Sequence, residues 1–292
     1  MVKNYFPQFI CFFVLLSIGL ASCKQLDPPE TIPAYMRINS VQLTTTPAQG
    51  SNSANIDCAW VYIDDNPVGA FPLPCTFPIV ASNGTHKLMV ISGIENDGIS
   101  AQRKQYPFYT NFEENVTLTQ GQTITVSPKV DYTSYADFHF MENFENSFIL
   151  LTPNPNKTQN NDTMVTTNVG AFQGRSGLVV MCGANNRYEG DIDTLFNLPK
   201  DGSTDVYLEF NYKSDAPFSV GMYYGSVGNE QTSIVFVDSS ATWNKMYVEL
   251  EPTIIQLANT TVELPFYIYF NTQLPSGMDT ARFMLDNIKV VQ

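Results

Sequence analysis

The chain has 292 residues, of which 43% are hydrophobic, and its 28 acidic residues against 15 basic ones give it a net charge of −13. A surface of this sign repels phosphate backbones, and no basic stripe or aromatic-basic motif opposes it, so nucleic acid is excluded as a partner. The length and the apolar content are sufficient for two domains, each with a core of its own.

Residues 1–22 have the three parts of an export signal. Lys3 supplies a positive start, FICFFVLLSIGL an apolar middle, and a small-residue pair leads up to Cys23. The apolar part is shorter than the ~20 residues that a transmembrane helix needs, so a permanent membrane span is the weaker interpretation. Two kinds of export signal remain: one in which Cys23 is modified by lipid, and an ordinary signal peptide in which Cys23 has no special role.

The block LASC, which ends at Cys23, resembles the lipobox of bacterial lipoproteins. This resemblance implies that residues 1–22 are removed and that Cys23 carries fatty acyl chains, several of which hold a protein firmly to a bilayer. Lys24 stands where these families place an aspartate for inner-membrane retention, which implies the outer membrane. The partner predicted here is therefore a membrane, contacted by a lipid anchor, with the leaflet left open.

Residues 23–35 are predicted to be an extended tether, because three prolines interrupt any regular ladder there. From 36 to 132 the chain has alternating, β-rich segments broken by turn residues. DDNPVG is predicted to be a hairpin turn, in which Pro67 fixes φ and Gly69 takes a positive φ.

VYIDDNPVGAFPL followed by NGTHKLMVISG resembles a PEGA-type domain, a small β-sandwich common in bacterial envelope proteins. The resemblance implies this fold for residues 36–132 and a packing role for His86. The other interpretation, that His86 is a ligand or a base, lacks a second histidine or an acidic cluster nearby in the sequence.

Three cysteines lie beyond Cys23. Cys58 and Cys75 could form a disulfide in an oxidising compartment, which would stabilise the domain by ~3 kcal/mol, but two buried free thiols explain the sequence equally well. Cys182 lies in the apolar pattern LVVMCGA and is predicted to be a small core residue.

Residues 133–292 contain eight short strand-like runs separated by Gly, Pro, Asn and Asp, which predict a β-sandwich. MENFENSF, the run from Trp243 to Leu250 and FMLDNIKVV resemble the jelly-roll domains of Bacteroidota envelope lipoproteins and, more distantly, galactose-binding-like carbohydrate-binding modules. The resemblance implies that Trp243 is buried. The predicted fold class is therefore all-β, a small PEGA-like sandwich followed by a jelly roll.

The jelly-roll resemblance also implies a structural calcium. In such modules the ion lies between an early FE segment and an aspartate of the last strand, and the matching residues here are Glu145 and Asp286. Calcium prefers six to eight oxygen ligands, which suits a site of this kind. The alternative is that Asp286 caps a turn and Glu145 is solvated.

Aromatic rings and amides on loops are the groups that bind sugars. The most ligand-like string is NNRYEGD, and a second candidate is the tyrosine pair in VGMYYG, of which only one ring can line a given surface. The candidate ligand-binding residues are Asn185, Arg187, Tyr188, Glu189, Tyr223 and Tyr224. A plain surface loop is the alternative for the first string.

No catalytic motif is present in the sequence. His86 and His139 are far apart, and neither H-E-x-x-H, C-x-x-C nor G-x-S-x-G occurs. Glu142 or Glu145 could still meet Asp191 or Asp193 in space, as glycosidases require.

The sequence therefore predicts a non-enzymatic outer-membrane lipoprotein that binds glycan or a partner protein through its C-terminal jelly roll. A structural or assembly accessory of an envelope complex is the second hypothesis. A glycoside hydrolase is the third.

Overall fold

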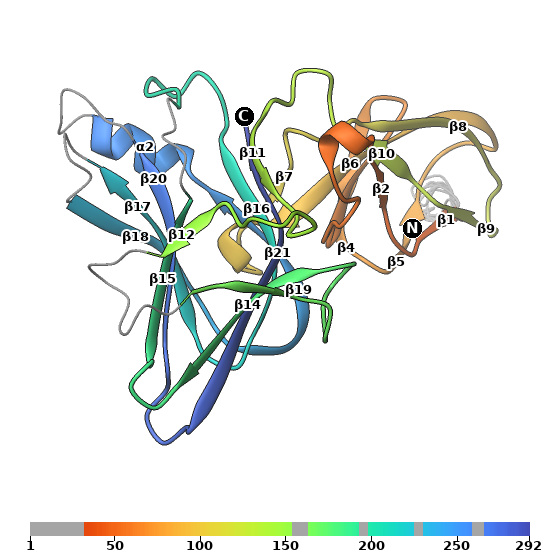
Figure 1. The fold of residues 1–292 in the computed structure, drawn as a ribbon. Helices are drawn as coiled ribbons and strands as arrows, with labels where there is room; N and C mark the ends of the chain where they lie inside the picture. The colour runs from red at the N-terminus through yellow and green to blue at the C-terminus, as the bar shows by residue number, and fades with distance from the viewer. Residues whose placement is uncertain (1–31, 154–162, 193–197, 225–229, 259–265) are drawn as a thin grey trace, which may run out of the picture.

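The computed structural model describes residues 32–153, 163–192, 198–224, 230–258 and 266–292 (Figure 1). The predicted signal peptide, Cys23 and residues 24–31 of the predicted tether lie outside these residues, as does Asp193. Within the described part of the chain, none of the helices has the length and apolar character needed to span a membrane.

Residues 34–131 form mostly short strands, and in β1 buried and exposed side chains alternate. In β1, Ala34, Met36 and Ile38 are buried while the residues between them face outward, as a half-buried strand requires. β1 begins at Ala34, which pairs with Ile79, so the last two residues of the predicted tether, 34 and 35, belong to a strand. The elements are β1 (Ala34–Ile38), β2 (Gln42–Thr44), η2 (Pro47–Gln49), β3 (Cys58–Ile63), β4 (Asn66–Pro72), β5 (Cys75–Ile79), β6 (Gly84–Glu95), η3 (Asn96–Gly98), β7 (Arg103–Gln105), β8 (Phe112–Leu118), β9 (Thr123–Val126) and β10 (Lys129–Asp131).

These strands form three sheets around one apolar core. Their orders are β5-β1-β9, β10-β2 and β4-β3-β6-β7, with β8 paired to β6. The buried side chains of all three sheets belong to one cluster. We call residues 32–132 the N-terminal unit; it forms the right-hand part of Figure 1.

The turn between β3 and β4 differs from the prediction. Asp64 and Asp65 are the turn residues, with φ of 50° and 63°, whereas Pro67 and Gly69 lie within β4. Two successive positive φ angles give the turn the twist of the flanking strands, and aspartate tolerates this conformation better than most residues.

The described residues after 132 form two sheets, one of six strands and one of five. The proximal sheet has the order β13-β14-β21-β16-β19, with β11 paired to β21, and the distal sheet has the order β12-β15-β20-β17-β18. The elements are β11 (Phe138–Glu142), β12 (Leu151–Pro153), β13 (Val165–Thr167), β14 (Ser176–Cys182), β15 (Arg187–Ile192), β16 (Tyr207–Ser214), β17 (Phe218–Tyr224), β18 (Glu230–Val237), β19 (Ser240–Glu249), α2 (Glu251–Ala258), β20 (Tyr267–Gln273) and β21 (Thr280–Val291).

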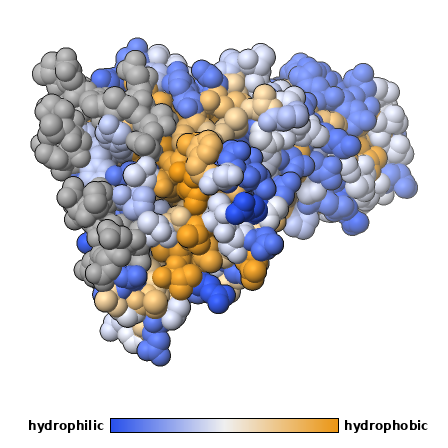
Figure 2. Space-filling model, in the orientation of Figure 1, coloured by the Kyte–Doolittle hydropathy of each residue, from blue (hydrophilic) through white to orange (hydrophobic). Residues whose placement is uncertain are grey.

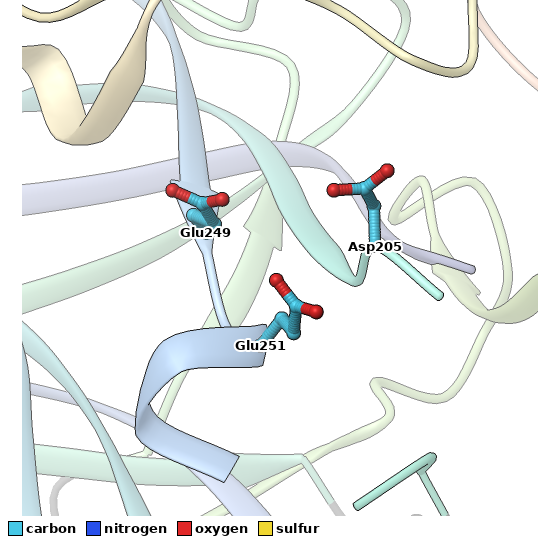
Figure 3. Close-up of side chains that lie close together, drawn as sticks. All are labelled: Asp205, Glu249 and Glu251. Atoms are coloured by element: carbon cyan, nitrogen blue, oxygen red, sulfur yellow. The ribbon is translucent and has the colours of Figure 1, made fainter. Parts of the chain in front are cut away.

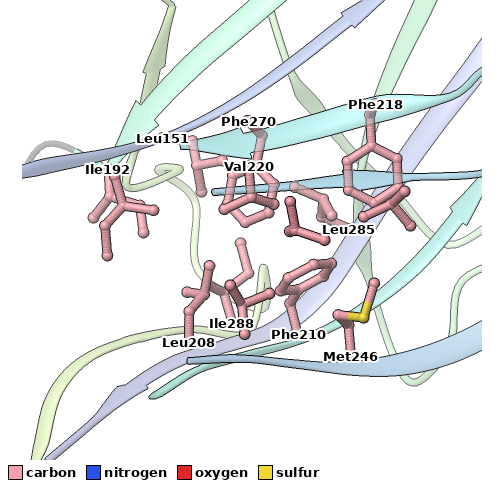
Figure 4. Packing of buried hydrophobic residues seen from close by; sticks show 14 of the residues in the cluster. Leu151, Ile192, Leu208, Phe210, Phe218, Val220, Met246, Phe270, Leu285 and Ile288 are labelled. Carbon is pink, nitrogen blue, oxygen red and sulfur yellow. The ribbon is translucent and has the colours of Figure 1, made fainter. Parts of the chain in front are cut away.

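The two sheets pack face to face. Figure 4 shows Phe210 and Leu285 of the proximal sheet directed toward Val220 and Phe270 of the distal sheet, and all four side chains are fully buried. The interior is a β-sandwich core, so the predicted all-β class is confirmed. The short helix α2 adds Ile254 and Leu257 to this core.

The N-terminal unit covers the outer face of the proximal sheet at β16, β19 and β21. Tyr106 donates a hydrogen bond of 2.5 Å to Glu209 of β16, and the hydroxyls of Tyr109 and Tyr247 lie 3.0 Å apart. Tyr207 and Tyr247 of the proximal sheet belong to the core of the N-terminal unit. The distal sheet lies on the side of the molecule away from this unit (Figure 1).

Candidate functional site

The string NNRYEGD is largely a strand and not a loop. Residues from Arg187 onward form β15, which lies between β12 and β20 in the distal sheet. Tyr188 faces the sandwich core, is fully buried, and has its ring centroid 6.2 Å from that of Phe283. This is not the position of a ligand-stacking ring. Asn185 precedes the strand, in a turn that Cys182 and Asn185 close through two backbone hydrogen bonds.

The adjacent tyrosines of β17 point to opposite faces, as the period of a strand requires. Tyr224 packs against the sandwich core. Tyr223 lies on the outer face of the distal sheet, where its ring centroid is 4.9 Å from that of Tyr269. Of the predicted ligand residues, the structure therefore brings Glu189 and Tyr223 together on this outer face.

Strand register places four residues in one row across the outer face. Glu189 of β15 is opposite Asn271 of β20, Asn271 is opposite Ser219 of β17, and Ser219 is opposite Phe236 of β18. Residues directly opposite one another share a face of the sheet. Phe236 is 80% exposed.

A hollow of about 520 Å³ lies at the Phe236 end of this row. The residues that line it include Phe236 and the polar residues Ser219, Asp238, Asn271 and Gln273. An exposed ring beside hydroxyl, carboxylate and amide groups is the combination that binds sugars, because the ring contacts C–H faces and the polar groups take hydroxyls.

Sequence reasoning did not find Phe236, Asn271 or Ser219. The signal for Phe236 was present in SIVFVDSS, where Val235 and Val237 alternate inward and leave the ring outward. Asn271 and Ser219 carried no comparable signal, because only strand pairing places them beside Phe236.

Glu189 is a fully buried carboxylate held by two donors. It accepts hydrogen bonds from the hydroxyl of Tyr223 and from Nδ2 of Asn271. Burial, and then the hydrogen bond to Glu189, raise the pKa of Tyr223 well above its ordinary value, so its hydroxyl stays protonated and remains a donor. A buried charge requires such partners.

Glu145 and Asp286, the residues predicted to bind calcium, line one hollow of about 500 Å³. Asp286 is buried and accepts a hydrogen bond of 2.6 Å from Ser176 Oγ. Glu145 accepts one of 2.8 Å from the backbone N–H of Arg175. Gly174, with φ of 52°, lets the chain pass Glu145, since a Cβ there would lie 2.0 Å from Glu145 Oε1.

The chemistry of this hollow fits an oxygen-seeking divalent cation. Burial, with a further contribution from the charge of Glu145, raises the pKa of Asp286 to about 6, and a divalent cation would relieve both effects. Asn143 and Gln173 also line the hollow and add amide oxygens to its two carboxylates. Pro47, Gly50 and Ser51 of the N-terminal unit form part of its wall.

A second acidic cluster lies where α2 begins. Figure 3 shows the carboxylates of Asp205, Glu249 and Glu251 close together. One oxygen of each carboxylate lies within 4.8 Å of one oxygen of each of the other two. Burial and the neighbouring carboxylates raise the pKa of Asp205 and of Glu251. Nζ of Lys104, in the N-terminal unit, lies 2.5 Å from Oε2 of Glu249. The lysine therefore provides a positive charge beside this acidic cluster. This cluster therefore contributes to the contact between the two units.

Of the two alternatives for Cys58 and Cys75, a disulfide or two free thiols, the structure has the free thiols. The two cysteines lie in different sheets, because β3 pairs with β4 and β6 while β5 pairs with β1. Burial raises the pKa of the Cys58 thiol to about 12, which makes it unreactive. Cys182 is exposed and not in the core, because it is the outward-facing last residue of β14.

Glu142, considered as one carboxylate of a catalytic pair, and Trp243, expected to be buried, have other roles in the structure. Both carboxylate oxygens of Glu142 accept backbone N–H groups, from Phe144 and Leu150, so this residue holds a turn. Trp243 is partly exposed and not buried; it donates to the Gly170 carbonyl and makes an edge contact with Phe172.

Apolar side chains are also exposed outside the sandwich core. Val165, Leu178 and Val180 lie on the outer face of β13 and β14, and Val165 and Val180 are 53% and 42% exposed. Figure 2 shows an apolar band running down the face on which Figure 1 places β12, β14 and β21. We call Val165, Leu178 and Val180 the β13–β14 patch.

No protein-family model matches the sequence, and no curated protein matches it. Solved structures resemble the chain at low identity. One is a carbohydrate-binding module of the β-sandwich superfamily, with a TM-score of 0.39 at 14% identity, which covers 80% of this chain and 85% of that one. Another is the family 30 carbohydrate-binding module of a Clostridium thermocellum cellulosomal cellulase, with a TM-score of 0.38 at 12% identity and coverage of 53% and 96%. A third is a family 22 xylan-binding domain, with a TM-score of 0.34 at 16% identity and coverage of 52% and 93%.

Proposed function

We propose that this protein binds glycan through the outer face of its distal sheet. The observation that carries the proposal is Phe236, an 80% exposed ring at the rim of a hollow of about 520 Å³ with polar side chains. An exposed ring adds little burial to the folded state, and a sugar ring can stack on it. The distal sheet faces away from the N-terminal unit (Figure 1), and Phe236 and Asp238 are exposed at one end of its outer face, where a polymer can reach them.

A matched pair of variants tests this proposal. Residues 24–292 are expected to bind at least one polysaccharide on a glycan array, and Phe236→Ala is expected to weaken that binding by about tenfold or more. Phe148→Ala is the control, because Phe148 is also an exposed phenylalanine, at 65%, and does not line the hollow. Equal loss in both variants, or none in either, contradicts the proposal.

We further propose that the protein works at the outer membrane, attached through acyl chains on Cys23. The support is the export signal and the lipobox-like block. Palmitate labelling of the full chain is expected to mark the wild type and not Cys23→Ala, and the variant is expected to leave the membrane fraction. A variant that stays in that fraction removes the anchor from the proposal.

A structural calcium at Glu145 and Asp286 belongs to the same proposal. The two residues lie in different segments, near the first and last strands of the C-terminal part, and an ion between them would tie these segments together. Its role there is to hold the chain in place, since a cation bound by a folded site stabilises the folded state.

The second candidate function is contact with an envelope protein. The observation that favours it is the β13–β14 patch, since apolar side chains gathered on one face often mark interaction sites. Val180→Lys is expected to abolish co-purification of a partner if this function is the main one, and to leave glycan binding unchanged. If Val180→Lys still co-purifies with the same proteins as the wild type, and glycan binding is lost only in Phe236→Ala, glycan binding is favoured as the main function.

A further inference from the structure

The outer face of the distal sheet is accessible at one end and buried further along. Tyr223 and Tyr269 lie on this face and are only 5% and 2% exposed. Gln273, four residues beyond Tyr269 on β20, is exposed and lines the hollow beside Phe236. A ligand therefore meets the sheet at the end where this hollow lies, and the two tyrosines are not among the groups that it contacts.

Arg187 lies at the same accessible end. It is the first residue of β15 and is opposite Gln273 of β20. Tyr188 faces the sandwich core, so the alternation of a strand places Arg187 on the outer face. Residues directly opposite one another share a face of the sheet, so Arg187 borders the hollow on its β15 side.

The guanidinium of Arg187 has donors to spare. Among the described residues none forms an ion pair or a hydrogen bond with it, and its Nε is buried without an acceptor. Glu189, the next outward residue of β15, accepts its hydrogen bonds from Tyr223 and Asn271 instead. A guanidinium presents several N–H donors in a planar fork, and a buried donor without an acceptor is unfavourable. A ligand with oxygen acceptors at this position would satisfy these donors.

Phe236 and Arg187 are separated by the width of four strands. Phe236 is on β18 and Arg187 on β15, with β17 and β20 between them. Neighbouring strands lie ~4.8 Å apart, so the three spacings amount to about 14 Å. Ser219 of β17 and Gln273 of β20 lie between the two ends, and both line the hollow. This span is longer than one sugar ring, so a ligand that contacts both ends is a chain of several rings.

We propose that the glycan-binding face continues from Phe236 across the strands to Arg187, which donates hydrogen bonds to the oxygens of a linear oligosaccharide segment several rings long. The inference rests on the proposed glycan binding at this face. It adds the length and the direction of the bound segment and a binding residue at its second end. Guanidinium N–H groups bind hydroxyl and carboxylate oxygens alike, so the ligand is defined here by its length and not by its charge.

The test measures affinity against ligand length on the soluble chain, residues 24–292. The probes are oligosaccharides of two and of six rings from β-glucan, mannan, xylan and polygalacturonate, titrated by calorimetry beside the parent polymers. In at least one series the wild type is expected to bind the six-ring probe about tenfold or more tightly than the two-ring probe. Equal affinity for the two lengths overturns this inference alone, because the Phe236 end then accounts for all of the binding. Binding of no probe and of no polymer overturns the proposed function together with it.

Variants at the two ends test the residues. Arg187→Ala is expected to reduce the advantage of the six-ring probe to about threefold or less and to leave two-ring binding unchanged, because a short ligand on Phe236 does not reach Arg187. Phe236→Ala is expected to weaken the binding of both lengths. Arg37→Ala is the control, since Arg37 is also an outward-facing strand arginine, on β1 of the N-terminal unit, and is expected to change neither. An unchanged length advantage in Arg187→Ala, or an equal loss in Arg37→Ala, overturns the inference.

Arg187→Lys separates the guanidinium fork from its charge. Lysine keeps the positive charge and loses the planar set of donors, so its length advantage is expected to fall between those of the wild type and Arg187→Ala. The melting temperature of each variant checks folding. A folded Arg187→Ala that binds both lengths more weakly by the same factor assigns Arg187 a structural role and overturns its part in the inference. If Arg187→Ala does not fold, an unchanged length advantage in Arg187→Lys has the same consequence.

Discussion

His86 is held on both sides of its ring. Nδ1 lies 2.6 Å from Asp64 Oδ2 and Nε2 lies 2.9 Å from the Ser82 carbonyl. Both neighbours are acceptors, so the charged imidazolium is favoured, and the hydrogen bond to Asp64 followed by that to Ser82 raises the pKa of His86. The hydrogen bond from His86 in turn lowers the pKa of Asp64. The packing role predicted for His86 is therefore also an electrostatic one.

This pair predicts a pH dependence of stability. The histidine contribution is complete below its ordinary pKa of 6.5 and is lost as pH rises through the higher folded-state pKa. The aspartate contribution is complete above its ordinary pKa of 3.8 and is lost as pH falls through the lower folded-state pKa. The loss of unfolding free energy in His86→Phe is therefore expected to be largest between these two values and to shrink in alkaline buffer.

Urea unfolding from pH 4 to pH 10 measures this difference. His139→Phe is the control, because it removes the other histidine of the chain. A difference between wild type and His86→Phe that stays constant over the whole range would falsify the electrostatic role.

Glu145 and Asp286 predict a response to metal removal. With calcium at about 100 times its Kd, a bound ion adds about 2.7 kcal/mol of stability, so the melting temperature is expected to rise by about 5–10 °C over that in chelator. Glu145→Gln is expected to remove most of this shift. Glu251→Gln is the control from the other acidic cluster, and loss of the shift there instead would move the ion to Glu251. Identical melting curves in chelator and calcium remove the metal altogether.

At the scale of elements, the β3–β4 turn depends on two aspartates with positive φ. Asp65→Ala is expected to cost about 1 kcal/mol, because alanine tolerates a φ of 63° poorly. Asp65→Asn keeps the turn chemistry and removes the charge that lies 3.4 Å from Lys87, so it is expected to cost less than half as much. Thermal unfolding of both variants separates backbone strain from charge, and equal losses would assign the effect to the ion pair.

The strands themselves were largely predictable. All eight apolar runs in residues 133–292 are strands in the structure, because alternation with turn residues between the runs is a local signal. β15 and β5 were among the strands that were missed, since RYEGDI carries charged residues and CTFPI contains a proline. Their pairing with β20 and β1 stabilises them as strands against weak local propensity.

At the scale of the whole molecule, Glu209 joins the two units. It is fully buried, lies 3.0 Å from Lys245 Nζ, and accepts hydrogen bonds from Tyr106 and Tyr132 of the N-terminal unit. Burial acts to raise its pKa, but the charges of Lys245 and Lys289 hold that pKa below the ordinary value. Lys245 Nζ and the Glu209 carboxylate are close but are not aligned for a hydrogen bond. Their attraction is therefore between opposite charges.

Glu209→Gln is expected to cost about 3 kcal/mol or more, because it leaves the buried Lys245 and Lys289 without their counter-charge. Glu114→Gln, at an exposed carboxylate of β8, is expected to change stability by less than about 0.5 kcal/mol. Calorimetry of the wild type is expected to give one transition, since the tyrosine contacts couple the two units. Two well-separated transitions, or equal losses in the two variants, contradict this coupling.

Composition, alternation and short motifs were enough to predict the all-β class, the eight C-terminal strands and, through a resemblance, the meeting of Glu145 and Asp286 at one hollow. These features are local or depend on a family-like spacing. Tertiary structure alone decided that Tyr188 is buried, that Phe236 lies in one row with Asn271 and Glu189, and that the N-terminal unit covers the proximal sheet. Strand order and register bring together residues far apart in the chain, and no local pattern encodes which strand becomes whose neighbour.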